Sequence, residues 1–108
     1  MSIKLPGPVA AYFAAEKKQD ADALARCFVE DGVVRDEGRT YKGVAAIKRW
    51  NEEARAKYHH SVEPISAVER DGSIAVSARL SGDFLNSPLS VEYICKLKGG
   101  KIASMEIR

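Results

Sequence analysis

A carboxylate at the end of a short apolar segment is the clearest candidate for chemistry in this sequence. Asp36 follows Val34 by two positions within the segment Val33-Val34-Arg35-Asp36. Because alternate residues of a strand share a face, Asp36 should point into a pocket if Val34 does, and an apolar wall would raise the pKa of its carboxyl group. Such a carboxylate suits proton abstraction next to a carbonyl group. Alternatively, Asp36 caps the turn that begins at Glu37 through a side-chain-to-backbone hydrogen bond.

Aromatic and imidazole side chains are the other candidates. Tyr12 and Trp50 both lie in segments of helical spacing, where an aromatic residue either fills the core or contacts a ligand. His59 and His60 stand where a helical pattern gives way to a strand pattern. Successive strand residues face opposite ways, and the phase with Val62 favours His60 as the one that points inward. Histidine titrates near neutrality, so His60 is either a pocket side chain or a solvated residue of the junction.

Three helices are expected in the first half of the chain. Apolar residues at helical spacing from Val9 to Glu16 predict the first helix, after two prolines that a first turn tolerates. Asp20 is a suitable N-cap for a short second helix over 21–28, and Gly43 opens a third helix that runs to about Lys57. Between the second and third helices, residues 33–36 predict a brief strand followed by a turn.

From His60 onward the apolar period changes from 3.6 to 2, which predicts four long strands. Asp71-Gly72 and Gly99-Gly100 are expected to form hairpin turns between them. The strand around Val76 and Ala78 presents both residues to the core, and the small Ala78 leaves room for a ligand. Helices first and strands afterwards give an α+β fold, with three N-terminal helices packed on a curved, mainly antiparallel sheet that encloses one pocket.

Composition narrows the class of protein. The chain has 108 residues, which is the size of a single domain over 1–108. The 17 basic and 15 acidic side chains are interspersed, which argues against nucleic acid as a partner. No apolar run is long enough for a membrane span, and the N-terminal MSIKLPGP lacks the apolar core of a secretory signal, so we expect a cytoplasmic protein. Two cysteines and two histidines form no metal motif, and no cofactor motif is present.

Several of these segments together resemble the NTF2-like superfamily, in its SnoaL-like and ketosteroid-isomerase-like branches. The resemblance rests on the aromatic pair Tyr12-Phe13, the D-A-D-A-L helix, F-x-x-D-G-V-V, the Y-K-G step, a helix with A-A-I-x-x-W, and the terminal GKIASMEI. It covers essentially the whole chain. It implies the fold more strongly than the activity, because this fold hosts many unrelated functions.

The resemblance also implies roles for individual residues. Asp36 falls where ketosteroid isomerases carry their general-base aspartate. Tyr12 matches the tyrosine that donates a hydrogen bond to the developing oxyanion in those enzymes, where the surroundings tune the pKa of the catalytic carboxyl groups. Trp50 corresponds to an aromatic pocket wall in the relatives. Tyr93 stands where the isomerases place a second, protonated aspartate, so steroid isomerisation itself is not implied. Relatives commonly form homodimers through the outer sheet face.

Three functions are therefore open. The first is a cofactor-independent isomerase or cyclase that uses Asp36 as base and Tyr12, with Tyr93, as hydrogen-bond donors. The second is a non-catalytic protein that binds a small apolar or carbonyl-containing molecule, with a ligand site that includes Trp50, His60, Val34 and Ala78. The third is a protein-interaction domain of the same fold.

Overall fold

The computed structural model describes residues 4–108, so the first three residues of the N-terminal segment examined for a secretory signal lie outside it. The elements follow in the order α1 (Gly7–Lys18), α2 (Ala21–Ala25), β1 (Phe28–Asp36), β2 (Arg39–Lys42), α3 (Val44–Tyr58), β3 (Ser61–Arg70), β4 (Ser73–Ser81), β5 (Leu89–Lys98) and β6 (Lys101–Ile107). Within residues 4–108, no helix is both long and apolar enough to span a membrane.

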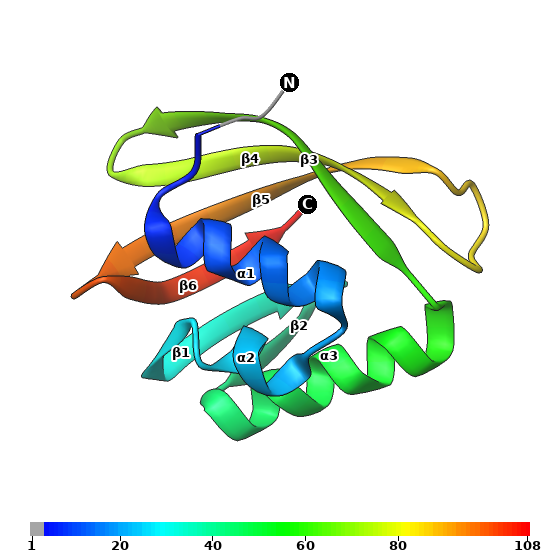
Figure 1. Ribbon diagram of the computed structural model, residues 1–108, viewed down its shortest axis with the longest axis horizontal. Coiled ribbons are helices and arrows are strands. Elements are labelled where there is room, and N and C mark those ends of the chain that lie inside the picture. The colour runs from blue at the N-terminus through cyan, green and yellow to red at the C-terminus, as the bar shows by residue number, and fades with distance from the viewer. Residues whose placement is uncertain (1–3) are drawn as a thin grey trace.

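One curved sheet carries all six strands, in the spatial order β2-β1-β6-β5-β4-β3. Neighbouring strands are antiparallel except β1 and β6, which run parallel. The sheet bends around α1, while α3 lies against the β1–β2 end and α2 packs against α1 and α3 (Figure 1). This arrangement confirms the predicted α+β fold with three helices on a mainly antiparallel sheet.

The first two strands differ from the sequence prediction. The second helix ends at Ala25, and β1 already begins at Phe28, well before the expected start at Val33. Phe28 is almost fully buried and pairs with Ile102 of β6, so tertiary packing extends the strand toward the helix. Strand β2, which was not predicted, forms because Glu37 and Gly38 both have positive φ, the geometry of a tight hairpin turn.

The helix boundaries have identifiable local causes. The Asp20 side chain accepts a hydrogen bond from the Ala23 backbone N–H at 3.0 Å, which confirms the predicted N-cap of α2. Gly43, with φ of 94°, begins α3 as expected. Between the helices and the sheet lies the apolar core, whose largest fully buried members are Tyr12, Leu24, Phe28, Ile47, Ile102 and Met105.

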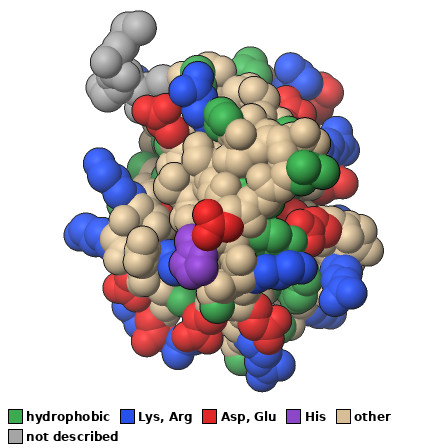
Figure 2. Space-filling model, turned by 90° about the vertical axis from the view of Figure 1, so that its right-hand side faces the viewer, with side chains coloured by type: hydrophobic (Ala, Val, Ile, Leu, Met, Phe, Trp, Pro, Cys, Tyr) green, Lys and Arg blue, Asp and Glu red, His purple; other side chains and the backbone are tan. Residues whose placement is uncertain are grey.

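Charged side chains of both signs are interspersed on the outer surface. Figure 2 shows the face formed by the right-hand side of Figure 1, where acidic and basic side chains alternate without a large patch of one sign. This pattern agrees with the small net charge of +2.

Candidate functional site

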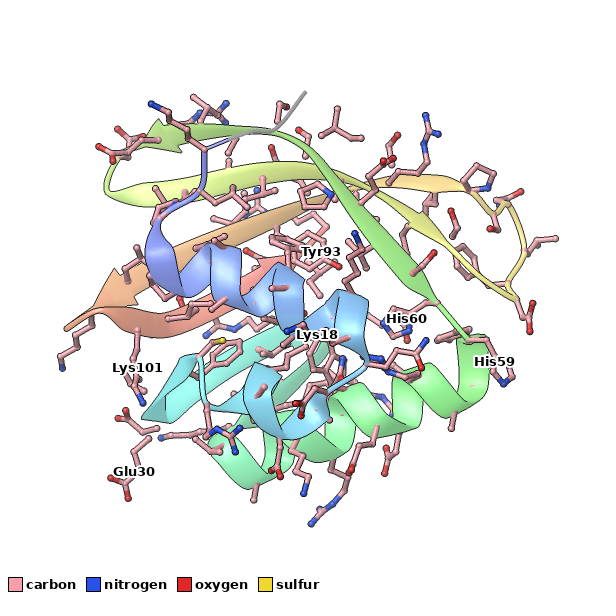
Figure 3. All side chains as sticks on the ribbon, viewed as in Figure 1. Lys18, Glu30, His59, His60, Tyr93 and Lys101 are labelled. Carbon is pink, nitrogen blue, oxygen red and sulfur yellow. The ribbon has the colours of Figure 1, made fainter. Side chains whose placement is uncertain are left out.

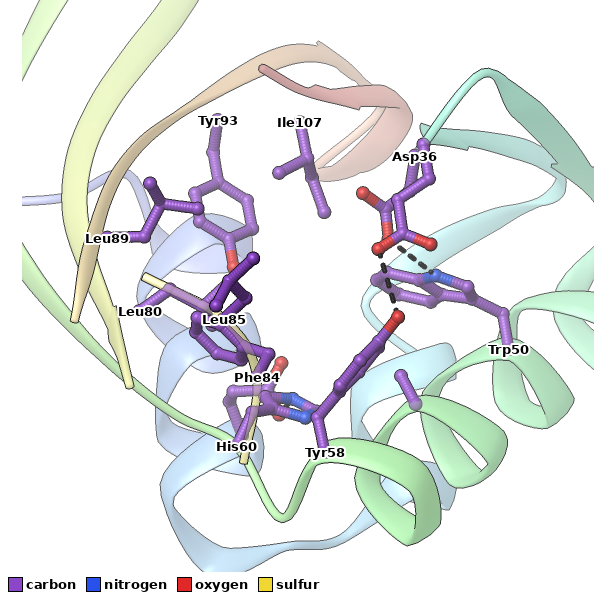
Figure 4. A pocket seen from close by; sticks show the side chains of 13 residues that line it. Asp36, Trp50, Tyr58, His60, Leu80, Phe84, Leu85, Leu89, Tyr93 and Ile107 are labelled. Atoms are coloured by element: carbon purple, nitrogen blue, oxygen red, sulfur yellow. Dashed lines mark hydrogen bonds and ion pairs between the residues drawn. The ribbon is translucent and has the colours of Figure 1, made fainter. Parts of the chain in front are cut away.

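A cavity of about 360 Å³ lies between the helices and one end of the sheet. Its walls are mostly apolar and include several aromatic rings (Figure 4). The lining residues are Glu16, Asp36, Glu37, Trp50, Ala54, Tyr58, His60, Leu80, Phe84, Leu85, Leu89, Tyr93 and Ile107. Helices α1 and α3, four strands and the loop over residues 82–88 therefore all contribute to one pocket. Cavities of this size and lining are typical of small-molecule sites.

Asp36 lines this cavity at the end of β1. The indole Nε1 of Trp50 donates a hydrogen bond to its Oδ2 at 3.1 Å (Figure 4). Burial raises the pKa of the Asp36 carboxyl group, and the neighbouring charge of Glu37 adds to that rise, while the Trp50 hydrogen bond opposes it. The Glu37 backbone N–H also stabilises the ionised form. The pocket location and the turn contact, which the sequence offered as alternatives, thus occur together.

The two tyrosines occupy different environments. Tyr93 lines the cavity, and among residues 4–108 its hydroxyl group has no hydrogen-bond partner. Burial raises the pKa of Tyr93, so the hydroxyl group stays protonated and can donate. Tyr12 is fully buried and is not one of the lining residues; its hydroxyl group donates to Glu16 Oε2 at 3.4 Å. The structure therefore places Tyr93, rather than Tyr12, at the surface of the pocket.

A buried carboxylate, Glu16, and the donors around it form a part of the cavity wall that the sequence did not predict. Glu16 accepts hydrogen bonds from Arg55 Nη2 at 2.7 Å, His60 Nε2 at 3.1 Å and Asn51 Nδ2 at 3.4 Å. Burial alone would raise the pKa of Glu16, but the hydrogen bond and charge of His60 and the charge of Arg55 lower it overall. In the sequence, the signal for this residue was the position of Glu16 one helical turn after Tyr12, on the same apolar face.

The two histidines point in opposite directions, as the strand phase predicts. The His60 side chain is 9% exposed and lines the cavity. His59 is 71% exposed and pairs with Asp83 Oδ2 at 2.9 Å. Figure 3 shows His60 directed between the helices and the sheet, with His59 directed outward.

The remaining predicted residues divide into two groups. Trp50 lines the cavity and also stacks on Tyr41, with ring centroids 6.0 Å apart. Val34 and Ala78 are buried in the core, as their strand phase predicts, but neither is a lining residue.

The loop over residues 82–88 completes the pocket, which no sequence motif indicated. Phe84 and Leu85 both line the cavity, and the Phe84 ring meets the Tyr58 ring edge-on, with centroids 5.9 Å apart. The Asp83 backbone N–H donates to the Tyr58 carbonyl oxygen at 2.6 Å. The loop is thus attached to the C-terminal end of α3.

The sequence matches a known protein family over most of its length. The family model of the SnoaL-like domain matches residues 9–105, which include every helix-borne and strand-borne polar residue of the pocket. The chain belongs to the SnoaL-like domain family. No protein of curated function matches the chain at a significant level.

Solved structures place this SnoaL-like domain among NTF2-like folds. A candidate polyketide cyclase from Sinorhizobium meliloti is 38% identical, with 96% of this chain and 95% of that chain covered and a TM-score of 0.93. A protein of ketosteroid isomerase-like fold from Catenulispora acidiphila, in complex with trimethylamine, is 22% identical (97% and 86% covered, TM-score 0.84). TerC, co-crystallised with polyporic acid, is 17% identical (94% and 87% covered, TM-score 0.81). The similarity to the last two structures supports only the assignment of the fold.

Proposed function

We propose that this SnoaL-like domain is a cofactor-independent isomerase or cyclase that moves a proton next to a carbonyl group. The observation that carries the proposal is Asp36, a carboxylate of raised pKa held by Trp50 in a mostly apolar cavity. A base whose pKa lies closer to neutrality than that of free aspartate is better matched to carbon acids.

The pocket supplies the groups for one such step. The Asp36 carboxylate takes the proton from the carbon next to the carbonyl, and the C–H electron pair forms the enolate double bond. The Tyr93 hydroxyl donates a hydrogen bond to the oxygen, where negative charge develops. We assign this donor role to Tyr93 rather than Tyr12, because the Tyr12 hydroxyl is committed to Glu16 and does not line the cavity.

The comparisons support a small organic substrate. The 38% identical relative is a candidate polyketide cyclase, and two further structural neighbours were determined with trimethylamine and with polyporic acid. Aromatic rings of Trp50, Tyr58 and Phe84 line the cavity here, so a planar carbonyl compound suits it.

Exchange of an α-hydrogen for deuterium tests this proposal without knowledge of the product. The enolisable bicyclic ketone 2-tetralone is incubated with the protein in deuterated buffer, and exchange is followed by proton NMR. We expect catalysed exchange with the native protein and a loss of about 10²–10⁴-fold in Asp36→Asn, the usual contribution of a general base. Glu30→Gln is the matched control, because Glu30 is an exposed carboxylate of the same strand, far from the pocket (Figure 3).

A binding measurement separates an enzyme from a carrier. If Asp36→Asn and the native protein bind 2-tetralone equally while neither catalyses exchange, the protein is a small-molecule binder and the catalytic proposal is rejected. Trp50→Ala should weaken binding in either case, because it removes an aromatic wall.

We also propose that the protein forms a homodimer through the outer face of the sheet. Ile65 and Val68 on this face are 50% and 49% exposed, an unusual position for large aliphatic side chains. Sedimentation equilibrium should give twice the mass of one chain, and Val68→Lys should return it to the monomer mass. A native monomer at all concentrations would exclude this assembly.

A further inference from the structure

The two ring nitrogens of His60 have different surroundings. Nε2 lies 3.1 Å from Glu16 Oε1. No side chain or backbone group within residues 4–108 forms a hydrogen bond with Nδ1, and this atom is also not among the fully buried polar atoms that lack a partner. Since the ring lines the cavity, Nδ1 is the nitrogen that a ligand can reach.

Glu16 determines which nitrogen carries the proton. Its carboxylate is held by donors from four residues, including Tyr12 and Asn51, and its lowered pKa keeps it ionised at neutral pH. An ionised carboxylate can only accept, so His60 Nε2 must be the donor. In the neutral ring the lone pair is then on Nδ1, facing the cavity.

Charged and polar groups from four elements surround His60. Glu16 of α1 attracts a positive charge, and Asp36 of β1 does so more weakly from across the site. Arg55 of α3 makes the closer contact with Glu16, at 2.7 Å, and also interacts with its charge. Tyr93 of β5 is a neutral hydroxyl group at this pH. Among these groups, Glu16 is the one that orients the ring, through its hydrogen bond with Nε2.

We propose that Glu16 positions His60 so that its Nδ1 accepts a hydrogen bond, and then a proton, from a hydroxyl group of the ligand. The inference rests on the proposed function in using the same cavity, and it adds a second proton-transfer group beside Asp36. The step balances without a co-reactant: the ligand O–H bond breaks, an N–H bond forms on Nδ1, and a phenolate–imidazolium pair results. Glu16 is a positioning residue in this step, since it acts through His60.

Nitrogen-15 NMR of the histidine rings tests the first half of the proposal in the native protein. The chain contains only His59 and His60, so labelled histidine gives two rings, and His59→Gln assigns them. We expect His60 to hold its proton on Nε2, with an unprotonated Nδ1, whereas His59 should hold its proton on Nδ1, which lies 2.9 Å from Asp83 Oδ2. A His60 ring protonated on Nδ1 alone would overturn the proposal. Glu16→Gln should lose the fixed tautomer, and the native measurement stands even if this variant unfolds.

The second half is tested with 2-naphthol, with naphthalene as the matched probe that lacks the hydroxyl group. We expect 2-naphthol to shift the His60 Nδ1 resonance toward the protonated form and to leave His59 unchanged. His60→Gln should weaken 2-naphthol binding about tenfold, the effect of one lost hydrogen bond, and leave naphthalene binding unchanged. Failure of 2-naphthol to bind, or equal binding by His60→Gln, would count against the proposal.

The same samples separate this inference from the proposed function. Asp36→Asn should keep the His60 response to 2-naphthol, because Asp36 takes no part in the tautomer or in the hydroxyl contact. A His60 response without any 2-tetralone exchange would leave the hydroxyl site standing and reject proton abstraction by Asp36. Exchange of 2-tetralone hydrogens by the native protein, without a His60 response to 2-naphthol, would support proton abstraction by Asp36 and reject the hydroxyl site at His60.

Discussion

Trp50 links the apolar wall of the pocket to the Asp36 carboxylate. Its ring lines the cavity, and its Nε1 donates to Asp36 Oδ2 at 3.1 Å. A hydrogen bond to the ionised form of a carboxyl group lowers the pKa, whereas burial of Asp36 raises it. The indole therefore limits how basic Asp36 becomes, in addition to any contact it makes with a ligand.

Trp50→Phe tests this role directly. The substitution keeps an aromatic ring but removes the donor that stabilises the ionised carboxylate, so the pKa of Asp36 should rise further. The carboxyl carbon-13 shift of Asp36 across pH measures the change. Tyr41→Phe is the control, because Tyr41 stacks on Trp50 and does not contact the carboxylate. An unchanged titration of Asp36 in Trp50→Phe would mean that the indole does not tune the base.

Glu16 should make stability depend on pH in a predictable direction. Its pKa in the folded protein lies below the ordinary value of 4.5, so its stabilising effect is complete above pH 4.5 and is lost as the pH falls through the folded pKa. Glu16→Gln leaves Arg55 and His60 without their carboxylate and should cost about 3 kcal/mol at pH 7. At acid pH, where the native Glu16 becomes protonated, the cost should shrink. Urea unfolding at both pH values measures it, and an equal cost at both would contradict the ion-pair explanation.

At the scale of elements, the loop over residues 82–88 is fixed to the end of α3 by close backbone packing. A Cβ atom on Gly82 would lie 2.6 Å from the Tyr58 carbonyl oxygen and 3.0 Å from the His60 Cα. These distances leave no room for a side chain, so glycine at this position allows the loop to approach the helix-to-strand junction. The approach brings Phe84 and Leu85 over the cavity.

Gly82→Ala should therefore displace the loop and disturb the pocket. We expect a loss of roughly 1–3 kcal/mol in unfolding free energy, as for other overpacked sites, and weaker binding of 2-tetralone. Gly7→Ala is the matched control, since a Cβ there meets nothing within 4 Å. Calorimetry and a binding titration on both variants give the comparison. A Gly82→Ala protein with native stability and affinity would show that the loop contact contributes little.

The sequence predicted elements whose signals are local and missed contacts that depend on distant residues. Turns at Asp71-Gly72 and Gly99-Gly100 were correct, because their glycines and positive φ angles are set by the turn itself. Strand β2 was missed because its four residues are mostly exposed and show no alternation of apolar residues. It forms at the edge of the sheet through its pairing with β1.

The candidate site was also predicted only in part, where its residues are placed by local patterns. Strand phase was enough to orient Asp36 and to choose His60 over His59. Helical spacing gave the inner face of α1 but not the partners of Glu16, which lie 35 to 44 residues away in the sequence. Such partners are set by how α1, α3 and the start of β3 pack together, which no periodic pattern encodes.

At the scale of the whole molecule, β6 is the centre of the sheet. It pairs in parallel with β1 on one side and antiparallel with β5 on the other, and both Ile102 and Met105 are almost fully buried. Strands β2 and β3 form the two edges. Backbone amides that are paired on both sides and covered by a core open only with global unfolding.

Hydrogen exchange should reveal this gradient. We expect the slowest exchange at the amides of β6, with opening free energies close to that of global unfolding, and faster exchange in β2 and in the exposed half of β3. Exchange followed by nitrogen–proton NMR at neutral pH gives the values residue by residue. Protection that is greatest in β3 would contradict the central role of β6.

The position of β6 also sets the order in which the protein can fold. The β1–β2 hairpin and the β3–β4–β5 meander each form from neighbouring segments, but they have no strand contact with each other until β6 enters between them. Closing the long chain segment between β1 and β6 is entropically slow. Asp36 on β1 and Tyr93 on β5 therefore come together only in this late step, so a folding intermediate would lack the pocket. Until then the facing edges of β1 and β5 stay unpaired, and these are the edges through which partly folded chains would aggregate.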